Sequence, residues 1–193
     1  MNKNRLLEQR HRIDKKRFNI TFTDNNADLI QQSIVQSWHR SDNANIPTER
    51  QQAPINATKS DQSYYLKKAL GYCQNQLQHI TLQSSMVMAV ADIGSTIIWT
   101  TASKSMQKAA EAVNFIEGGC WGESQVGTNA LALSLKTQQS TCVFSNEHYM
   151  PSVHEWVCYA TPIIEPHTKQ VIGVLDLSTT WQNHNNFGIF AAE

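Results

Sequence analysis

The residues most able to bind a ligand or take part in chemistry are concentrated in one glycine-rich segment, Gly118 to Asn129. Gly118, Gly119 and Gly122 permit positive φ and close backbone approach, and Trp121 adds a broad apolar wall with one N–H donor. Glu123 or Ser124 can begin a helix whose free N–H groups and positive dipole end lie beside the turn. Such a place suits a carbonyl, carboxylate or hydroxyl group of a small ligand. For any single residue the alternative is that the glycines only turn the chain and the indole only fills the core.

Thr128 and Asn129 are expected in the first turns of a helix that runs from about 123 to 136. Two interpretations remain open for them. Their side chains either face a ligand cavity or cap and hydrogen-bond the local backbone.

A second group of candidates, further along the chain, suggests a metal site: Glu147, His148, His154 and Cys158. Imidazole, carboxylate and thiolate all bind zinc or iron. The spacing argues against a metal, because Cys158 falls in an expected strand, where residues four apart do not form one helical face. We expect no metal and no cofactor. Glu147 and His148 are instead expected to order a loop or to hydrogen-bond a ligand.

The cysteines leave a redox switch or a reductase open as an alternative. The four cysteines have no C-x-x-C spacing, and a reactive thiolate needs an electropositive, accessible setting. Free cysteine is more often a small buried hydrophobe, which is what we expect of Cys158. Cys120 lies in an expected loop and is the better reactive candidate, with Cys142 as a third member of the group. We expect no catalytic residue in this chain.

Hydrophobic periodicity and turn residues predict the elements that position these side chains. Helices are expected at about 24–40, where Asp24, Asn25 or Asn26 caps the start, and at 60–80, 104–113 and 123–136. Strands are expected at 86–92, 96–101, 140–144, 156–164 and 171–178.

Three local features refine this prediction. Gly94 is expected to supply the turn of a hairpin between the first two strands. Pro162 lies inside an expected strand, which indicates an edge or a bulge there. The segment 187–193 is expected to begin a closing helix that is cut short at Glu193.

The pattern predicts an α+β fold, an antiparallel sheet with helices on one face and loops on the other. Residues 1–58 are expected to form an N-terminal helical lead and a linker, because 42–58 contains two prolines and many amide side chains. Residues 59–193 are expected to form the main domain.

Charge and composition exclude several classes of protein. Residues 1–17 hold seven basic and two acidic side chains, whereas the remainder has nine basic and fourteen acidic ones and a net charge of about −5. A mildly acidic body is a poor nucleic-acid surface. The start has no secretory apolar region and no apolar run spans a bilayer, so we expect a cytoplasmic protein.

Five sequence stretches together resemble a known family. They are S-W-H-R-S at 37–41, F-I-E-G-G-C-W-G-E-S-Q-V-G-T-N-A-L-A-L-S-L at 115–135, E-H-Y at 147–149, W-V-C-Y-A-T-P-I-I at 156–164 and I-G-V-L-D-L-S at 172–178. In this order and spacing they resemble the GAF domain at the front of bacterial acetoin- and glycerol-type transcriptional activators, which work with the sigma-54 form of RNA polymerase. The resemblance covers about residues 30–190 and implies a sensor rather than an enzyme.

The resemblance also implies a ligand and its partners. The ligand is expected to be a small acetoin-, diol-, ketone- or aldehyde-like metabolite. The expected ligand-binding residues are Trp121, Glu123, Thr128, Asn129, His148 and Trp156. No phosphate-binding loop and no helix-turn-helix is evident, so DNA or RNA polymerase is expected to be reached only through domains absent from this segment, which we take to be excised from a longer regulator. A homodimer is expected.

Two alternatives to metabolite sensing remain. The first is a protein-interaction or dimerisation module without a ligand, which uses the helices at 26–40 and 60–80. The second is a cysteine- or metal-based redox switch.

Overall fold

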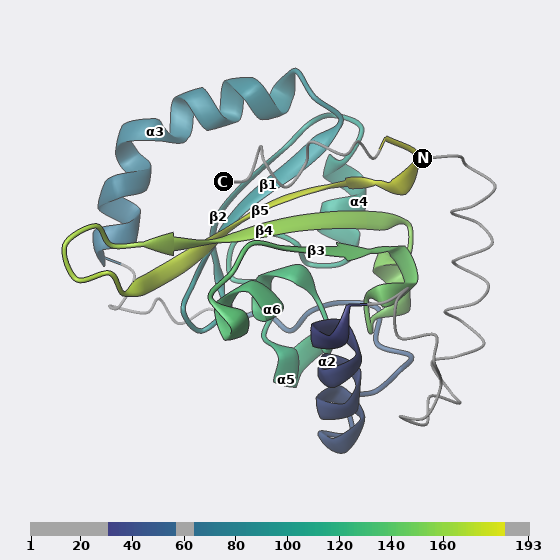
Figure 1. The fold of residues 1–193 in the computed structure, drawn as a ribbon. Helices are drawn as coiled ribbons and strands as arrows, with labels where there is room; N and C mark the ends of the chain where they lie inside the picture. The colour runs from purple at the N-terminus through teal and green to yellow at the C-terminus, as the bar shows by residue number, and fades with distance from the viewer. Residues whose placement is uncertain (1–30, 57–63, 184–193) are drawn as a thin grey trace.

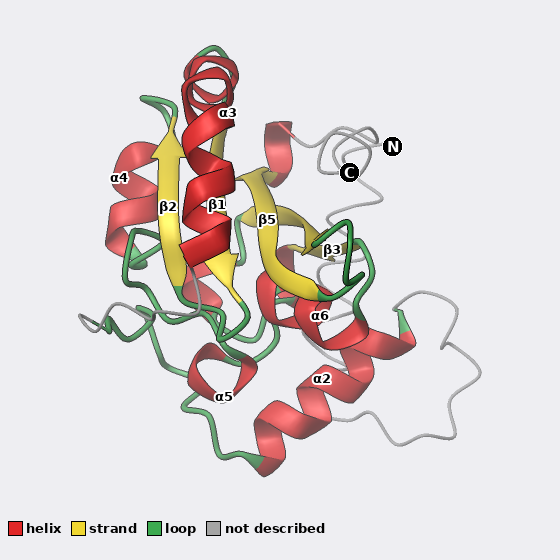
Figure 2. Ribbon diagram, turned by 90° about the vertical axis from the view of Figure 1, so that its left-hand side faces the viewer, coloured by secondary structure: helices red, strands yellow, loops and turns green. Residues whose placement is uncertain are grey.

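The computed structural model describes residues 31–56 and 64–183. At its centre is one five-stranded antiparallel sheet with the order β2-β1-β5-β4-β3, and helices cover both faces (Figures 1 and 2). The predicted α+β class and the antiparallel sheet are confirmed.

The five strands fall close to their predicted positions. They are β1 (Met86–Asp92), β2 (Ile97–Ala102), β3 (Thr141–Phe144), β4 (Trp156–Ile164) and β5 (Val171–Thr180). β1 pairs with β2 and β4 pairs with β5, as the two predicted hairpins require, and β1 pairs with β5 to join them. The longest strand, β5, therefore lies at the centre of the sheet, and the next longest, β4, lies beside it.

The first hairpin turns differently from the prediction. The residue with positive φ is Ser95, at 63°, and not Gly94. Asp92 organises the turn, because its Oδ1 accepts hydrogen bonds from the backbone N–H of Gly94 and of Thr96, both at 3.0 Å. An Asx-type turn of this kind explains why a non-glycine residue holds the left-handed position.

Pro162 occupies the kind of place that its missing N–H requires. β3 pairs only with residues Val157 to Ala160 of β4, so Pro162 lies beyond the end of β3 and has a strand on one side only. A register shift follows directly, between Ile163 and Ile164. The predicted edge or bulge is confirmed.

The helices include one clear departure from prediction. They are α2 (Gln32–Asn43), α3 (Tyr64–Leu82), α4 (Gln107–Ala112), α5 (Glu123–Val126) and α6 (Ala130–Thr137). The expected single helix at 123–136 is broken into α5 and α6 at Gly127, whose φ is 74°. A Cβ at Gly127 would lie 2.5 Å from the Tyr149 side chain. The close approach of Tyr149 therefore requires a glycine where the helix breaks.

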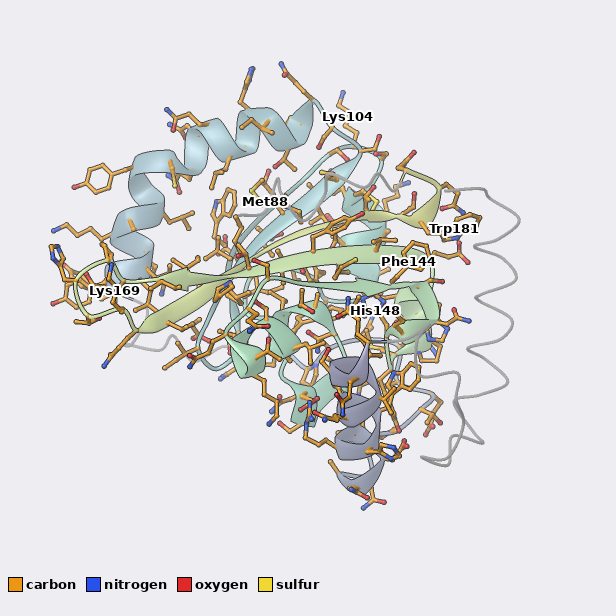
Figure 3. The ribbon with its side chains drawn as sticks, in the orientation of Figure 1. Met88, Lys104, Phe144, His148, Lys169 and Trp181 are labelled. Carbon is orange, nitrogen blue, oxygen red and sulfur yellow. The ribbon has the colours of Figure 1, made fainter. Side chains whose placement is uncertain are left out.

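The two faces of the sheet bury different sets of side chains. One face carries α3, which packs on β1 and β2 through residues such as Leu66 and Leu70. The other carries α6, α2 and several loops over the largest hydrophobic cluster. In Figure 3, Met88 lies on the α3 side of the sheet and His148 on the opposite side. We call these the α3 face and the cavity face.

The segment before α3 is part of the packed structure. Ile34 and Trp38 of α2, with Ile46 and Ala53 after it, are buried in the core cluster of the cavity face. The expected linker at 42–58 therefore packs on the domain over its described part, 42–56. The domain boundary at residue 58 stays a prediction. The expected helix cap at Asp24 to Asn26 and the closing helix at 187–193 lie outside the described residues.

Within the described residues, no helix is long and apolar enough to cross a membrane.

Candidate ligand-binding site

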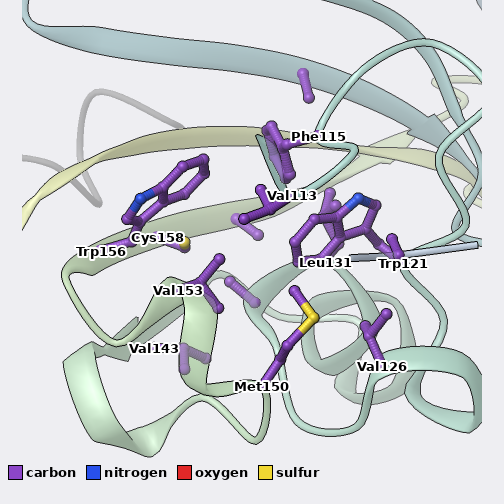
Figure 4. Close-up of a cluster of buried hydrophobic side chains, with 14 of the residues drawn as sticks. Val113, Phe115, Trp121, Val126, Leu131, Val143, Met150, Val153, Trp156 and Cys158 are labelled. Carbon is purple, nitrogen blue, oxygen red and sulfur yellow. The ribbon is translucent and has the colours of Figure 1, made fainter. Parts of the chain in front are cut away.

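A small cavity lies on the cavity face, between α6 and the sheet and beside Trp121. Figure 4 shows the buried side chains around it, among them Phe115, Trp121 and Trp156. The volume of the cavity is about 10 Å³, which is about the space that one water molecule needs. It is lined by Phe115, Trp121, Asn129, Ala130, Leu131, His148, Val153, Trp156, Cys158 and Asp176.

Three aromatic rings form the apolar wall. Phe115 lies edge-to-face against Trp121, with ring centroids 5.0 Å apart, and against Trp156 at 5.7 Å. The indole Nε1 of Trp121 donates to the backbone oxygen of Asn114 at 3.0 Å. A Cβ at Gly119 would lie 2.2 Å from the same oxygen, so this loop closes on Trp121 only with a glycine there. The ring is fixed in place by packing and by its polar edge.

His148 and Cys158 form one polar wall. The imidazole is buried, with Nδ1 2.9 Å from the Ser145 backbone oxygen and Nε2 3.2 Å from Cys158 Sγ. A carbonyl oxygen only accepts, so Nδ1 carries a proton and donates it to Ser145, while Nε2 faces the thiol. Burial raises the pKa of Cys158 well above its usual range, which keeps the sulfur protonated. The two side chains therefore already hydrogen-bond to each other.

Asp176 forms the other polar wall and was missed by the sequence analysis. It is a buried carboxyl on β5, the central strand, and Ser178 Oγ donates to its Oδ1. Burial raises the pKa of Asp176 from 3.8 to about 7, and the hydrogen bond from Ser178 opposes that rise. The signal was present in the sequence, because Asp176 alternates with Val174 and Ser178 on the buried side of a predicted strand.

Asn129 is a cap as well as a cavity residue. It lies at the N-cap of α6, where its Oδ1 accepts from Ala132 N at 3.0 Å. Its Nδ2 donates to the backbone oxygens of Trp121 and Gly127, each at 2.8 Å. Both interpretations left open above apply to Asn129, because its side chain caps α6 and also lines the cavity. The side chain stabilises the loop that carries Trp121.

Thr128 does not line this cavity. It is buried between α5 and α6, and its Oγ1 has no hydrogen-bond partner among the described residues. Its expected place in the first turns of a helix is wrong, because the helix breaks at the preceding glycine.

Glu123 is also outside the cavity lining. Its carboxylate is held by Arg40, whose Nε and Nη2 donate to Oε2 at 2.8 Å and Oε1 at 2.7 Å. Ser37 Oγ also donates to Oε1. Glu123 therefore joins α5 to α2, and its donors come from the S-W-H-R-S motif.

Trp38 of that motif and Asp42, which follows it, contact the loop that carries His148. Trp38 Nε1 donates to the Glu147 backbone oxygen at 2.7 Å, and Tyr149 Oη donates to Asp42 Oδ1 at 2.9 Å. Burial raises the pKa of Glu147 to about 7, although the N–H of Phe144 lowers it by donating to the carboxylate. Two segments about a hundred residues apart thus meet at the border of the cavity.

The comparison with known protein families identifies the chain. A model described as the MimR N-terminal domain matches residues 10–191. The chain belongs to this family.

Curated relatives of this MimR-type domain include regulators of transcription. The acetoin dehydrogenase operon transcriptional activator AcoR of Bacillus subtilis is 28% identical over 156 residues, which are 77% of this chain and 26% of AcoR. The propane 2-monooxygenase operon transcriptional activator MimR of Mycolicibacterium smegmatis is 23% identical over 151 residues, 78% of this chain and 26% of that protein. The chain spans about a quarter of the length of these relatives. The family is a regulatory domain of transcriptional activators and not an enzyme.

A solved structure confirms the fold. The crystal structure of the E. coli DhaR(N)-DhaL complex contains a chain that matches with a TM-score of 0.71 at 18% identity, over 83% of this chain and 56% of that chain. Together with the family match, this confirms the predicted resemblance to the sensory domains of acetoin- and glycerol-type activators.

The MimR-type domain brings together four of the six residues expected to bind a ligand: Trp121, Asn129, His148 and Trp156. Glu123 and Thr128 lie outside this cavity, and sequence analysis did not select Phe115 or Asp176. Whether any of these residues binds a ligand stays a prediction.

The cysteine and metal alternatives gain little from the geometry. Within the described residues, no group of three or more His, Cys, Asp or Glu side chains is placed to hold a metal ion. Burial raises the pKa of Cys142 to about 12 and that of Cys158 well above its usual range, which disfavours reactive thiolates there. Cys120 is half-buried, and its Sγ donates to the Gly118 backbone oxygen at 3.6 Å.

Proposed function

We propose that the chain is the signal-receiving domain of a cytoplasmic transcriptional activator, and that its signal is a small uncharged metabolite bound in the cavity beside Trp121. The observation that supports this most is the lining itself. Aromatic and aliphatic side chains enclose a space that also borders a buried carboxyl, and apolar pockets with a few polar groups are typical of small-molecule sites.

The size of the cavity defines how such a ligand binds. Acetoin has about six non-hydrogen atoms, and a space of about 10 Å³ does not hold it. The lining side chains must therefore move apart, and the affinity is reduced by the fraction of molecules that are open. At about 1.5 kcal/mol per atom the ceiling is about 9 kcal/mol. With the opening cost, dissociation constants between about a micromolar and a millimolar follow.

The border of the cavity provides a route for the signal. Trp121 is two residues from Glu123, which Arg40 and Ser37 hold against α2. His148 follows Glu147, whose backbone oxygen accepts from Trp38 of the same helix. A ligand that moves Trp121 or His148 favours a different packing of α2, and it shifts the equilibrium by its differential affinity for the two packings.

The names of the relatives suggest the chemical class of the signal. AcoR is named for the acetoin dehydrogenase operon and MimR for the propane 2-monooxygenase operon. By analogy, we propose a short ketone, hydroxyketone, diol or aldehyde. We propose further that the activator acts with sigma-54 RNA polymerase and contacts DNA through domains outside this segment.

Calorimetric titration with acetoin, 2,3-butanediol and acetone tests this proposal. Two variants of the lining supply the controls. Ala130→Leu fills the cavity and is expected to abolish binding, whereas Val153→Ala enlarges it and is expected to strengthen binding several-fold by lowering the cost of opening. Circular dichroism checks that both variants fold. Heats that do not saturate for the wild type and for Val153→Ala would reject the proposal.

A second candidate is a module that senses another protein. The outer side of α3 exposes apolar and aromatic side chains: Tyr64, Tyr65, Tyr72, Ile80 and Leu82. The similar DhaR chain was solved in a complex with DhaL, and self-association through α3 would give the expected homodimer. A monomer by light scattering at about 100 µM, well above the concentration at which a stable dimer forms, would reject the homodimer.

A further inference from the structure

We propose that Asp176 is the polar anchor of the cavity and that it selects uncharged ligands carrying a carbonyl or hydroxyl oxygen. This inference rests on the proposed function, because it assigns a role to a residue of the same cavity.

The position of Asp176 leaves room for a ligand above the sheet. The residues paired with Asp176 on the two flanking strands are Ala89 on β1 and Ala160 on β4, and both are fully buried. Two alanines provide little side chain on either side of the carboxyl. Asp176 therefore rises from a floor of small residues towards α6 and the cavity that it lines.

The fold does not need a carboxyl here. The other residues of β5 that face the same cluster include Val174, and α6 packs over this part of the sheet with apolar side chains such as Leu131. Burying a carboxyl among them costs free energy unless its hydrogen bonds are satisfied. Ser178 donates one hydrogen bond to Oδ1, and a carboxyl has capacity for more. A ligand oxygen is the partner that uses that capacity.

The surrounding groups exclude ligands with a negative charge. Among the described residues that line the cavity, none is a lysine or an arginine. The titratable groups near Asp176 are Cys158 of β4, Cys142 of β3 and His148 of the adjoining loop. Burial raises the pKa of both thiols, which keeps them uncharged. An anion would enter beside a carboxyl with no cation to offset it.

The aromatic wall does not favour a positively charged ligand either. Phe115 contacts both indoles edge-to-face, at centroid distances of 5.0 and 5.7 Å. Cation recognition uses the faces of rings that surround an open centre, and these rings are packed against one another instead. An uncharged ligand fits the lining better than an ion of either sign.

The protonation state of Asp176 links ligand binding to pH. Burial raises its pKa to about 7, and a protonated carboxyl can donate to a carbonyl and accept from a hydroxyl. A neutral ligand that accepts this hydrogen bond stabilises the protonated carboxyl and raises the pKa of Asp176 further. The protein therefore takes up a proton when the ligand binds. Affinity is then full below about pH 7 and falls as the pH rises above that value.

The test compares the affinity of the wild type and of Asp176→Asn for acetoin at about pH 6 and about pH 8.5. For a ligand-bound pKa near 8, the wild type should bind about five- to tenfold more weakly at the higher pH. Asp176→Asn keeps a donor of the same shape and does not ionise, so its affinity should change less than about twofold. Glu147→Gln is the matched control, because burial also raises the pKa of Glu147 to about 7. This variant should retain the pH dependence of the wild type.

A second measurement does not depend on any variant folding. Carbon-13 NMR of the Asp176 carboxyl should show its pKa rising when acetoin saturates the protein. A pKa that stays constant or falls would overturn the inference.

The outcomes separate this inference from the proposed function. If Asp176→Asn binds acetoin with the same pH dependence as the wild type, the inference is overturned and the proposed function stands. The same holds if pyruvate or an alkylamine binds more tightly than acetoin. If none of these probes binds at either pH, the proposed function fails and the inference falls with it.

Discussion

The two faces of the sheet are built from alternate residues of the same strands, but they bury different chemistry. On the α3 face, β5 contributes Leu175 and Leu177, which pack with apolar residues of the neighbouring strands. On the cavity face the same strand contributes Val174, Asp176 and Ser178. A single helix covers much of the α3 face, and its outer side is exposed.

This difference separates structural burial from functional burial. On the α3 face, β5 buries the hydroxyl of Thr179 beside its two leucines and no carboxyl, so the central strand can be covered on that side without an ionisable group. The carboxyl on the cavity face is therefore not explained by the need to cover the sheet, and it carries a desolvation cost that the α3 face avoids. Asp176 and His148, which border the same cavity, are the places where we look for function.

The largest effect should come from neighbouring substitutions on opposite faces. Leu177→Ala removes a buried side chain from the α3 face and should lower the free energy of unfolding by about 2–5 kcal/mol. Asp176→Asn removes a buried charge and should leave the stability at about pH 8 unchanged or raised. Urea denaturation measures both. A loss in Asp176→Asn as large as that in Leu177→Ala would remove the distinction between the faces.

The pH dependence of stability should reveal the same carboxyl. The pKa of Asp176 is raised from 3.8 to about 7 in the folded state, so the folded protein binds more protons than the unfolded chain between these values. The free energy of unfolding should therefore fall as the pH rises from about 4 to about 7, by up to about 4 kcal/mol from this residue. Asp176→Asn should make that fall smaller, and part of it should remain because burial also raises the pKa of Glu147 to about 7. A wild-type profile that rises across the same range would contradict the assignment.

The attachment of α2 to the cavity face should give an intermediate effect. Arg40→Ala leaves Glu123 without its cation and should cost about 1–2 kcal/mol, with faster amide hydrogen exchange in α2. Lys68→Ala, on an exposed position of α3, is the control and should change stability by less than about 0.5 kcal/mol. Unchanged exchange in α2 would mean that the contact with Glu123 does not hold this helix in place.

The smallest effect should come from the outer side of α3. Tyr72 is 80% exposed, so Tyr72→Ser should change the free energy of unfolding by less than about 0.5 kcal/mol. A loss of more than about 1 kcal/mol that depends on protein concentration would instead show that α3 is covered by a second molecule.

The sequence predicted the strands better than the site. Alternation and turn residues placed all five strands, and the missing N–H of Pro162 correctly indicated a strand edge. The helix at 123–136 was predicted as continuous because its apolar pattern continues past the point where Tyr149 requires Gly127. Local pattern does not report such a tertiary contact.

The roles of individual site residues depended on partners far away in the sequence. Glu123 was expected at the ligand, but its partner Arg40 lies 83 residues earlier. Asp176 is a polar residue on one side of a predicted strand. The motif at 172–178 was interpreted as a strand, and its carboxyl was not considered as a site residue. Trp121 and Trp156 both line the cavity, and whether either one binds a ligand stays a prediction.

Methyl NMR during a titration tests the central claim most directly. Leu131 and Val153 line the cavity, whereas Leu70 and Leu177 report on the α3 face. As acetoin, 2,3-butanediol or acetone is added, the account predicts saturable shifts of the Leu131 and Val153 methyl signals, with much smaller changes for the other two. Signals that stay fixed on both faces, or shifts confined to the α3 face, would contradict it.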